Sequence, residues 1–466
     1  MKPREVHPSV LFVSARRAAP TDDAVADGSA ARPFQTVGDA VRAASSGALI
    51  RIGEGTFAET LVIERSVALV GAGPARTRIV GAAGEKSAAI HASGDIRVEI
   101  RDLSVEHAAT ALTAIGGSVR LQNVALRELS EAAMDARGAE LAFTDGEILD
   151  VGSGMTGVAV RIDGGSLEMR RSIMRAAGRR AIEVRRARAL LDSMDVSYSA
   201  LAALQAIDGA EVSVDGGRFA WFSGSVLYAG AATLKVSRAA VSHGEYAVVG
   251  FRGARIELRD SELADTKIAN VGLVRAHGLL DHCVLVRGGT DGAVAISEGT
   301  GTVRLLGNRI ITPGSIGVHI THSTVVMKDN SIVGVRLDRE KDLGDAVYAV
   351  DADLSLERNE LRDNAGSAVT ATRSRVQLLK NRFIRNGRAG LVLLDRSSAS
   401  ANENVFDRND GPGVQVAERS AATLLANRFS GNAVYHVDAV CDGGGTVDVG
   451  TSNTFVGAAM PNHPCR

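Results

Sequence analysis

One short pattern recurs six times between residues 302 and 437 and restricts what this chain can fold into. The pattern is apolar-x-apolar-x-x-Asn-x-apolar, and its Asn positions are 22, 29, 22, 23 and 23 residues apart. A second pair of apolar residues begins ten residues after each Asn, except near residue 347, where about seven extra residues displace it. A period near 22 residues with short alternating strands predicts a parallel β-solenoid. The six copies place their amides at Asn308, Asn330, Asn359, Asn381, Asn404 and Asn427.

The recurrent Asn has a physical role at an inward corner between two strands. Its side-chain amide both donates and accepts hydrogen bonds, so Asn stacked on Asn forms a ladder at the strand spacing of roughly 4.8 Å. The alternative is a set of unrelated turns that use Asn because it tolerates the left-handed conformation. We favour the ladder because all copies keep one register.

The same corner pattern continues toward the N-terminus with other residues in the Asn slot. With two or three coils before residue 103, the repeat predicts about 17 coils. Small or aliphatic residues fill most of these earlier slots, which recur every 21–26 residues at Leu103, Val124, Gly146, Ser172, Met194, Gly217, Ala239, Ser261 and Cys283.

A short amphipathic helix is predicted ahead of the coils, where it would cover the open edge of the first one. The sequence therefore predicts three segments. These are a lead-in and capping helix at residues 1–47, a parallel β-helix at 48–440 and a capping segment at 441–466. Residues 336–344, rich in charge, are expected to project as a loop. One face of the helix has apolar residues at i, i+3, i+4 and i+7, namely Val37, Ala40, Val41 and Ala44.

Composition suits thin coils and gives no bulk charge that would attract a partner. Aromatic residues make up 4% of the chain, and the formal net charge is −1. We therefore expect no nucleic-acid partner. The longest N-terminal apolar run, residues 10–13, is too short for a signal-peptide core or a transmembrane segment, so the chain is either cytoplasmic or trimmed.

The three cysteines bear on which cellular compartment contains the protein. Cys283 falls in an inward slot, while Cys441 and Cys465 flank a Gly-rich C-terminal segment. A disulfide between Cys441 and Cys465 would indicate an oxidising, extracytoplasmic compartment, and two free thiols fit the sequence equally well. Our expectation is an extracytoplasmic protein.

The first coils resemble a known family. Residues 33–81 contain Phe34-Gln35-Thr36-Val37, Gly55-Thr56-Phe57-Ala58-Glu59 and Gly71-Ala72-Gly73, followed by Thr77 and Ile79. This run resembles the opening coils of the pectin lyase-like superfamily, most closely the start of pectin methylesterases, and the later repeats resemble the right-handed parallel β-helix repeat. The resemblance implies an all-β, single-stranded right-handed parallel β-helix. It implies fold more than activity, because many β-helix proteins that are not esterases share this start.

The catalytic motifs of that superfamily are absent. The chain has no Gln-Asp-Thr-Leu-Tyr-like segment of the methylesterases, no Gly-His-Gly of polygalacturonases and no Asp-Pro-His-Glu of mannuronan epimerases. One partial match is Leu280-Asp281-His282-Cys283 followed by Asp291-Gly292, which resembles pectate lyase elements whose acidic residues hold Ca²⁺. The downstream Arg-x-Pro-x-x-Arg of those lyases is missing, and Asp-x-Cys corners are common in β-helices. We expect no cofactor, with Ca²⁺ at Asp281 and Asp291 as the alternative.

Candidate site residues lie on the outward row of the strand that begins ten residues after each slot. Such a row forms a strip with a spacing of roughly 4.8 Å. A smaller patch on this row consists of His319 and Tyr348. The larger patch, with Trp221 in a loop beside it, consists of Asp135, Arg161, Glu183, Arg185, Gln205 and Tyr228.

This larger patch has two interpretations. Carboxylates, guanidiniums, an amide and aromatic rings are suited to holding a saccharide chain, whereas acids alternating with Arg are also ordinary cross-strand pairing. Two coils separate Asp135 from Glu183, which fits the roughly 6.5–9.5 Å between the carboxyls of an inverting glycosidase. The catalytic candidates are therefore Asp135, Arg161 and Glu183. The ligand-binding candidates are Glu183, Arg185, Gln205, Trp221 and Tyr228.

Two functional hypotheses follow. The first is a non-catalytic β-helix protein that binds polysaccharide or a cell-surface component, or acts as a surface scaffold, since the fold is intact and the catalytic motifs are absent. The second is a carbohydrate-active enzyme, a polysaccharide lyase or glycoside hydrolase, with an atypical site. In the first hypothesis Trp221 stacks on a sugar ring; its alternative position is beneath its own loop against Phe219 or Phe222.

Overall fold

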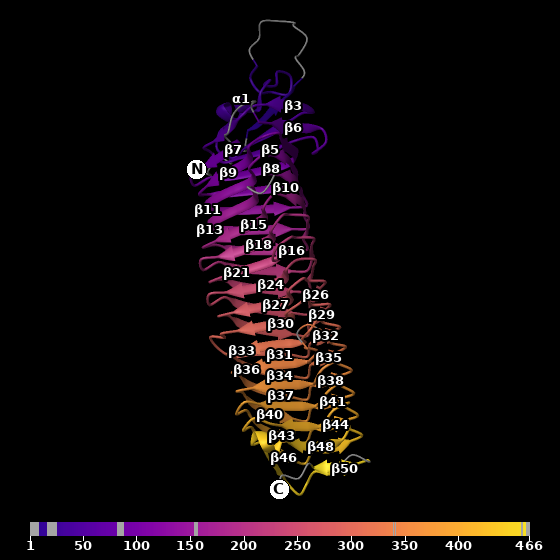
Figure 1. Ribbon diagram of the computed structural model, residues 1–466. Coiled ribbons are helices and arrows are strands. Elements are labelled where there is room, and N and C mark those ends of the chain that lie inside the picture. The colour runs from indigo at the N-terminus through magenta and orange to yellow at the C-terminus, as the bar shows by residue number, and fades with distance from the viewer. Residues whose placement is uncertain are drawn as a thin grey trace, which may run out of the picture. The chain divides into compact units, whose positions relative to one another are not determined.

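A computed structural model of the chain describes residues 9–15, 26–81, 88–152, 157–338, 340, 342–457 and 460–462. The chain divides into two compact units, Met1–Gly224 and Ser225–Arg466, and each is described by itself. Within the described residues, the regular structure is β-strand except for helix α1 (Val37–Ala43) and the 3-10 turn η1 (Cys441–Gly443) (Figure 1). The strands form about 18 turns of right-handed parallel β-helix. The predicted all-β fold is confirmed, and the predicted number of coils is close.

Three short strands separated by corners make one coil. In the first unit these are β15 (Arg180–Arg185), β16 (Arg188–Asp192) and β17 (Asp195–Ser197), and the next coil has β18 (Ala202–Ile207), β19 (Glu211–Asp215) and β20 (Arg218–Ala220). Each strand pairs in parallel with its counterpart, as Glu183 does with Gln205. Equivalent positions of successive coils therefore form straight rows.

The second unit repeats this construction. Strands β39 (Val369–Thr372), β40 (Arg375–Leu379) and β41 (Arg382–Ile384) pair with β42 (Leu391–Leu394), β43 (Ser398–Asn402) and β44 (Val405–Asp407). The predicted loop at residues 336–344 lies between β35 (Ser331–Val333) and β36 (Val347–Val350), where a bridge joins Asp338 to Leu343. Strands β49 (Thr446–Val449) and β50 (Thr454–Val456) continue the coil pairing past residue 440.

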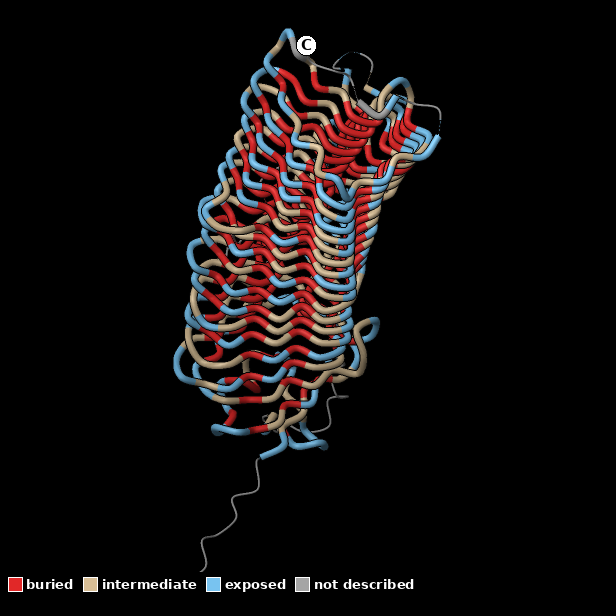
Figure 2. The backbone as a smooth tube through the Cα atoms, turned by 90° about the horizontal axis from the view of Figure 1, so that it is seen from below, coloured by how far each residue is buried: buried red, intermediate tan, exposed pale blue. Residues whose placement is uncertain are grey.

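The core is a column of mostly small aliphatic side chains inside the coils. Alternate residues of a strand point inward, as in β19, where Val212 and Val214 are buried while Glu211 and Ser213 are exposed. Figure 2 shows the buried residues on the inner side of the windings and many exposed ones at the corners. Among the described residues, no helix has the length and apolar character needed to cross a membrane.

The predicted asparagine ladder is present in the second unit. Asn381 Oδ1 accepts hydrogen bonds from the backbone N–H and the Nδ2 of Asn359, at 2.8 and 3.0 Å. Its own Nδ2 donates to Leu356 O at 2.8 Å and to Asn404 Oδ1 at 3.0 Å. The same Nδ2 to Oδ1 bond joins all members of the ladder, which are Asn308, Asn330, Asn359, Asn381, Asn404, Asn427 and Asn453.

A second asparagine ladder, which the sequence analysis did not predict, lies five residues further along each coil. Asn364, Asn386, Asn409 and Asn432 are joined from Nδ2 to Oδ1 at 2.9, 2.9 and 2.8 Å. Both ladders satisfy the polar groups of buried corners that water does not reach. The signal for the second was visible as Asn-x-x-x-x-Asn in four successive coils.

Helix α1 confirms the predicted amphipathic segment. Val37, Ala40 and Val41 are buried, and the helix packs near β1 (Val10–Val13), β2 (Ala48–Ile52) and β4 (Leu61–Ile63). The Glu59 carboxylate accepts hydrogen bonds from the backbone N–H groups of Val37 and Gly38 at 2.8 and 2.7 Å. At the other end of the chain, Cys465 lies outside the described residues, so the proposed disulfide with Cys441 is not described.

Candidate functional site

The first unit contains the predicted outward row, which we call the charged row: Asp135, Arg161, Glu183 and Gln205. Its residues lie on β11 (Ala132–Thr144), β13 (Val158–Arg170), β15 and β18, and the strand register pairs each with the next. Asp135 and Glu183 are therefore two coils apart, as the sequence predicts. The strands place these side chains side by side because outward positions of successive coils are about 4.8 Å apart.

Arg161 lies between the two carboxylates of the charged row. Its Nη1 is 3.6 Å from Asp135 Oδ2, and its Nε is 3.8 Å from Glu183 Oε1. Glu183 also accepts a hydrogen bond from Arg180 Nη1 at 3.1 Å. The side chains of Asp135 and Glu183 are only 18% and 11% exposed. The row is thus recessed, and its acids are matched by guanidinium groups.

Two hydrogen-bond acceptor atoms of the charged row have no donor. Asp135 Oδ1 and Gln205 Oε1 are buried and have no hydrogen-bond partner among the described residues. Asp135 also lines a hollow of about 320 Å³, together with Arg161, Glu183 and Arg185, whereas Gln205 does not line it. Arg185 lies near Asp208, with its Nε 3.4 Å from Oδ2.

Trp221 lies on the surface of the first unit and stacks on Tyr198, a residue that the sequence analysis did not select. We call these two residues the aromatic pair. Their ring centroids are 6.3 Å apart, their planes differ by 5°, and they are 62% (Tyr198) and 44% (Trp221) exposed. At this exposure the Trp221 ring is not buried beneath its loop, and a contact with Phe219 or Phe222 stays a prediction. A separation of 23 residues, one coil period, was the signal that could have linked the two rings.

The corner geometry of the coil places the aromatic pair. Tyr198 follows β17 and Trp221 follows β20, and Ser197 pairs with Ala220, so both rings occupy one row. Each residue has positive φ, 60° for Tyr198 and 71° for Trp221, which turns the chain at the corner and directs the side chain outward. Glu183 and Gln205 of the charged row lie on other strands of the same two coils, whereas Asp135 and Arg161 lie on the two preceding coils.

Tyr228, the last predicted binding residue, belongs to the second unit. It lies on β21 (Leu227–Gly230), where its half-buried ring is 5.7 Å from that of Phe251. The smaller predicted patch is also in this unit. His319 on β33 (Val318–Thr321) meets Tyr348 on β36 edge to face, with centroids 5.8 Å apart, because the register pairs the two residues.

The second unit also has a hollow of about 580 Å³ at the base of the 336–344 loop. We call it the Asp345 hollow. Its floor includes three consecutive members of one outward row, Tyr348, Thr370 and Val392, and its wall includes Asp342 of the loop. Residues on straight rows and one long insertion thus combine to make a concave site.

Asp345 is the buried acid of this hollow. It is 4% exposed, and its Oδ1 accepts hydrogen bonds from Ser367 N–H at 2.8 Å and Thr370 Oγ1 at 3.0 Å. Burial raises the pKa of Asp345 because it disfavours the charged form. This residue was not predicted from the sequence, although an acid that directly follows an insertion and precedes a strand was a visible signal.

The calcium candidates occupy ordinary positions on coils of the second unit. Asp281 ends β28 (His277–Asp281), where its carboxylate pairs with Arg259 and lies 2.7 Å from His282 Nδ1. Asp291 precedes β30 (Gly292–Ser297). No group of three His, Cys, Asp or Glu side chains in the described ranges is arranged to hold a metal. Ca²⁺ binding at Asp281 and Asp291 stays a prediction.

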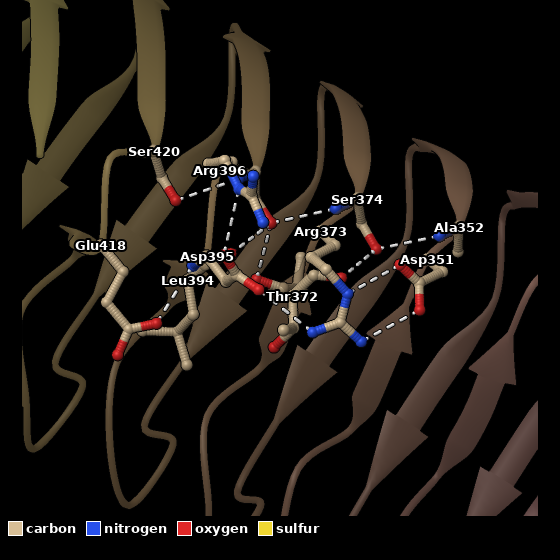
Figure 3. A network of polar contacts seen from close by, with 12 residues as sticks. Asp351, Ala352, Thr372, Arg373, Ser374, Leu394, Asp395, Arg396, Glu418 and Ser420 are labelled. Atoms are coloured by element: carbon tan, nitrogen blue, oxygen red, sulfur yellow. Dashed lines mark hydrogen bonds and ion pairs between the residues drawn. The ribbon is translucent and has the colours of Figure 1, made fainter.

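Ion pairs also connect neighbouring coils at the corners of the second unit. Figure 3 shows Arg373, which donates to Asp351 at 2.8 and 3.0 Å and to Asp395 at 3.1 Å. These hydrogen bonds lower the pKa of Asp351 and of Asp395 below the ordinary Asp value. Paired charges of this kind leave the surface close to neutral, in agreement with the net charge of −1.

Comparisons with known proteins agree with this fold. Residues 292–458 match the family described as right handed beta helix region. No curated protein sequence matches the chain significantly. Among solved structures, the A-module of mannuronan C-5 epimerase AlgE6 from Azotobacter vinelandii is 12% identical with a TM-score of 0.41, covering 92% of this chain and 94% of that one. The catalytic unit of a GH87 alpha-1,3-glucanase from Streptomyces thermodiastaticus is 10% identical with a TM-score of 0.32, covering 91% and 65%.

These TM-scores are too low to support a conclusion about activity. The family match at residues 292–458 and the strand arrangement both indicate the same repeating coil. The fold that the resemblance of residues 33–81 implies, a right-handed parallel β-helix, is confirmed. In its fold, the described chain is a right-handed parallel β-helix, and residues 292–458 match the family model of that name.

Proposed function

We propose that this protein binds polysaccharide without altering it, and that the aromatic pair of the first unit holds a sugar ring. The observation that carries the proposal is the exposure of two nearly parallel rings in a chain with 4% aromatic residues. Large aromatic rings gain stability from burial, so a stacked pair left in solvent is suited to contact with a ligand. The apolar C–H face of a pyranose packs on such a ring.

The charged row supports the proposal from the same unit. The Arg161 and Arg185 side chains line a hollow there, are 41% and 40% exposed, and can donate hydrogen bonds to sugar hydroxyls. Both the charged row and the aromatic pair follow the direction in which the coils are stacked, so contacts recur at about 4.8 Å. A polymer can use such recurring contacts, whereas a small molecule cannot. The proposed location of this protein is extracytoplasmic, where polysaccharides occur.

A carbohydrate-active enzyme is the second candidate. It is favoured by the burial of the Glu183 side chain, 11% exposed, beside a hollow of about 320 Å³, which is a usual setting for a catalytic carboxyl. We rank it second because Arg161 lies within 4 Å of both Asp135 and Glu183, in the space that an inverting reaction would leave for water. Release of reducing ends or unsaturated products from a polysaccharide panel, lost in Glu183→Ala, would replace our proposal with this one.

The test of the binding site uses the single Trp of the chain as its own reporter. A glycan array first identifies a ligand, and Trp fluorescence then measures its dissociation constant. We expect Trp221→Ala to weaken binding by roughly 2- to 13-fold, because one aromatic stacking contact contributes about 0.5–1.5 kcal/mol. Tyr198→Ala should act in the same direction.

Leu425→Ala is the matched control, since Leu425 is an apolar side chain of the second unit that is 50% exposed. It should leave binding unchanged. Because Trp221→Ala removes the fluorophore, that variant is measured by calorimetry. Equal affinity of Trp221→Ala and the parent chain would rule out the aromatic pair as the site.

A further inference from the structure

Among its described residues, one face of the second unit has no Asp, Glu, Lys or Arg side chain over six coils. The face is formed by the first strand of each coil: β21, β24 (Tyr246–Phe251), β27 (Ala269–Val274), β30, β33 and β36, which follow one another in Figure 1. The strand register joins the outward residues of these strands into two straight rows, which we call the uncharged strip. The first row is Tyr228, Val249, Gly272, Ala295, His319 and Tyr348, and the second is Gly230, Phe251, Val274, Ser297, Thr321 and Val350.

The absence of charge is particular to this face. Asp, Glu, Lys and Arg make up 23% of the chain, and in the same coils the outward row of the second strands includes Lys235, Glu257 and Arg304. Charged side chains also occupy the corners beside the strip, where Arg275 pairs with Glu298. Outward positions of a solvated sheet are normally polar, so an outward face of this composition indicates contact with a ligand.

Aromatic rings lie at both ends of the uncharged strip. Tyr228 and Phe251 have ring centroids 5.7 Å apart at one end, and His319 meets Tyr348 edge to face at the other. Small side chains such as that of Ala295 lie between these ends. The ends are separated by roughly 24 Å, because neighbouring coils are about 4.8 Å apart. The strip therefore has the length of an oligosaccharide, which can contact both ends at once.

Tyr246 adds a third tyrosine to this face, of five in the chain. A Cβ atom at Gly272 would be 2.8 Å from Tyr246 Cε1 and 3.0 Å from its Cδ1, so the ring lies over the space that this glycine leaves open. The hydroxyls of Tyr228 and Tyr246 make no hydrogen bond to a described residue. Burial raises the pKa of Tyr246, and the charges of Asp291 and Glu245 raise it further. The Tyr246 hydroxyl therefore stays protonated and can donate a hydrogen bond to a ligand.

The absence of charge decides which ligand the uncharged strip accepts. A carboxylate or sulfate bound there would lose water without gaining a cationic partner, which is unfavourable. A neutral sugar ring packs its apolar face on aromatic and aliphatic side chains, and its hydroxyls can stay in contact with water. Straight rows suit an extended, β-linked chain. A protein partner fits less well, because the residues of the strip are buried or half-buried and leave little area toward the roughly 800 Å² that each partner contributes to a stable interface.

We infer that the uncharged strip binds an extended, uncharged, β-linked polysaccharide whose chain runs in the direction in which the coils are stacked. Tyr228 contacts one end of the bound segment and Tyr348 contacts the other. The inference rests on the proposed function in that the ligand is a polysaccharide. It adds a second site, in the second unit, and a class of ligand: neutral chains rather than uronates or sulfated chains.

The experiment compares two hexasaccharides with the same linkage by calorimetry at one pH and ionic strength: cellohexaose and the β-1,4-linked glucuronate hexamer. We expect cellohexaose to bind at least tenfold more tightly. Tyr228→Ala and Tyr348→Ala should each weaken cellohexaose binding by roughly 2- to 13-fold, the effect of one aromatic contact. Tyr228→Phe keeps the ring and should retain most of the affinity. Absence of cellohexaose binding, equal affinity for the two hexamers, or no effect of either Ala substitution would overturn the inference.

Ala295→Arg tests whether the missing charge sets this preference. The strand position accepts Arg, since Arg161 occupies the corresponding position in the first unit. We expect a gain of at least tenfold in affinity for the glucuronate hexamer, because a guanidinium pairs with a carboxylate. Ala295→Gln has a side chain of similar reach without the charge and should leave glucuronate binding weak. An equal gain in the two variants, with melting curves that show both to be folded, would overturn the role of charge.

Repeating the cellohexaose titrations in the Trp221→Ala background separates the strip from the aromatic pair. Dependence on Tyr228 and Tyr348 that persists there supports the strip as a site of its own. Loss of all binding in that background overturns the strip and leaves the proposed function standing. An unchanged affinity in that background contradicts the aromatic pair and leaves the strip standing.

Discussion

At the scale of single residues, Asn381 shows how one side chain maintains a corner. It is fully buried and takes part in four hydrogen bonds with Asn359, Asn404 and the backbone. Asn381→Ala leaves these buried polar groups without a hydrogen-bond partner. Each such group lowers the free energy of unfolding by about 1–3 kcal/mol. We expect the free energy of unfolding in urea to fall by about 3 kcal/mol.

Asn402→Ala is the control for that measurement. Asn402 lies two residues before the ladder residue Asn404, and only its backbone carbonyl accepts from it, at 3.0 Å. Its side-chain truncation should change stability by less than about 0.5 kcal/mol, the usual range at surface positions. Equal losses in both variants would show that the ladder side chains do not stabilise the coil.

At the scale of elements, helix α1 is held by a carboxylate from outside the helix. Glu59 accepts from the N–H groups of Val37 and Gly38, which have no partner within so short a helix. Glu59→Gln keeps the shape but removes the negative charge that favours a helix N-terminus. We expect faster amide exchange at Val37 and Gly38, corresponding to about 1 kcal/mol.

Glu54→Gln provides the comparison for α1. The Glu54 carboxylate pairs with Arg76 at 2.9 Å on the surface, and both side chains are more than 60% exposed. Exchange at Val37 and Gly38 should be the same as in the parent chain. Protection that survives in Glu59→Gln would show that the packing of α1, and not this cap, holds its first turn.

The elements also show what a sequence can predict in a repeat protein. The ladder at Asn381 and the buried face of α1 were predicted because each follows a period, and a period fixes which way a side chain points. Tyr198 and Asp345 were not predicted, because neither belongs to a periodic pattern. The aromatic pair occurs in only two coils, and the position of Asp345 depends on the path of an insertion that no period constrains.

At the scale of the whole molecule, exposed Asp–Arg pairs join neighbouring coils in both units. Hydrogen bonds from Arg lower the pKa of Asp145, Asp265, Asp329 and Asp363 below 3.8. A carboxyl whose pKa is lower in the folded state stabilises that state above the unfolded pKa, and the contribution is lost as pH falls through the folded pKa. Asp345, with a raised pKa, acts in the opposite direction.

Thermal melting between pH 7 and pH 3 checks this balance. Burial also lowers the pKa of His436, so we expect a small fall in melting temperature below about pH 6.5, and a steeper fall below about pH 4, where the several lowered Asp pKa values outweigh the raised one. Added salt should reduce the fall, because exposed pairs are screened. A melting temperature that rises below pH 4 would show that buried acids such as Asp345 outweigh the corner pairs.

The two asparagine ladders have a direction. In each, the Nδ2 of one coil donates to the Oδ1 of the next higher-numbered coil, from Asn308 to Asn453 and from Asn364 to Asn432. All the amide dipoles therefore point the same way, and each polarises its neighbours. Turning one amide around would oppose nitrogen to nitrogen on one side and oxygen to oxygen on the other. The orientation of every amide in a ladder is thus fixed collectively, and the second unit contains two parallel lines of aligned dipoles whose positive ends face its last coils.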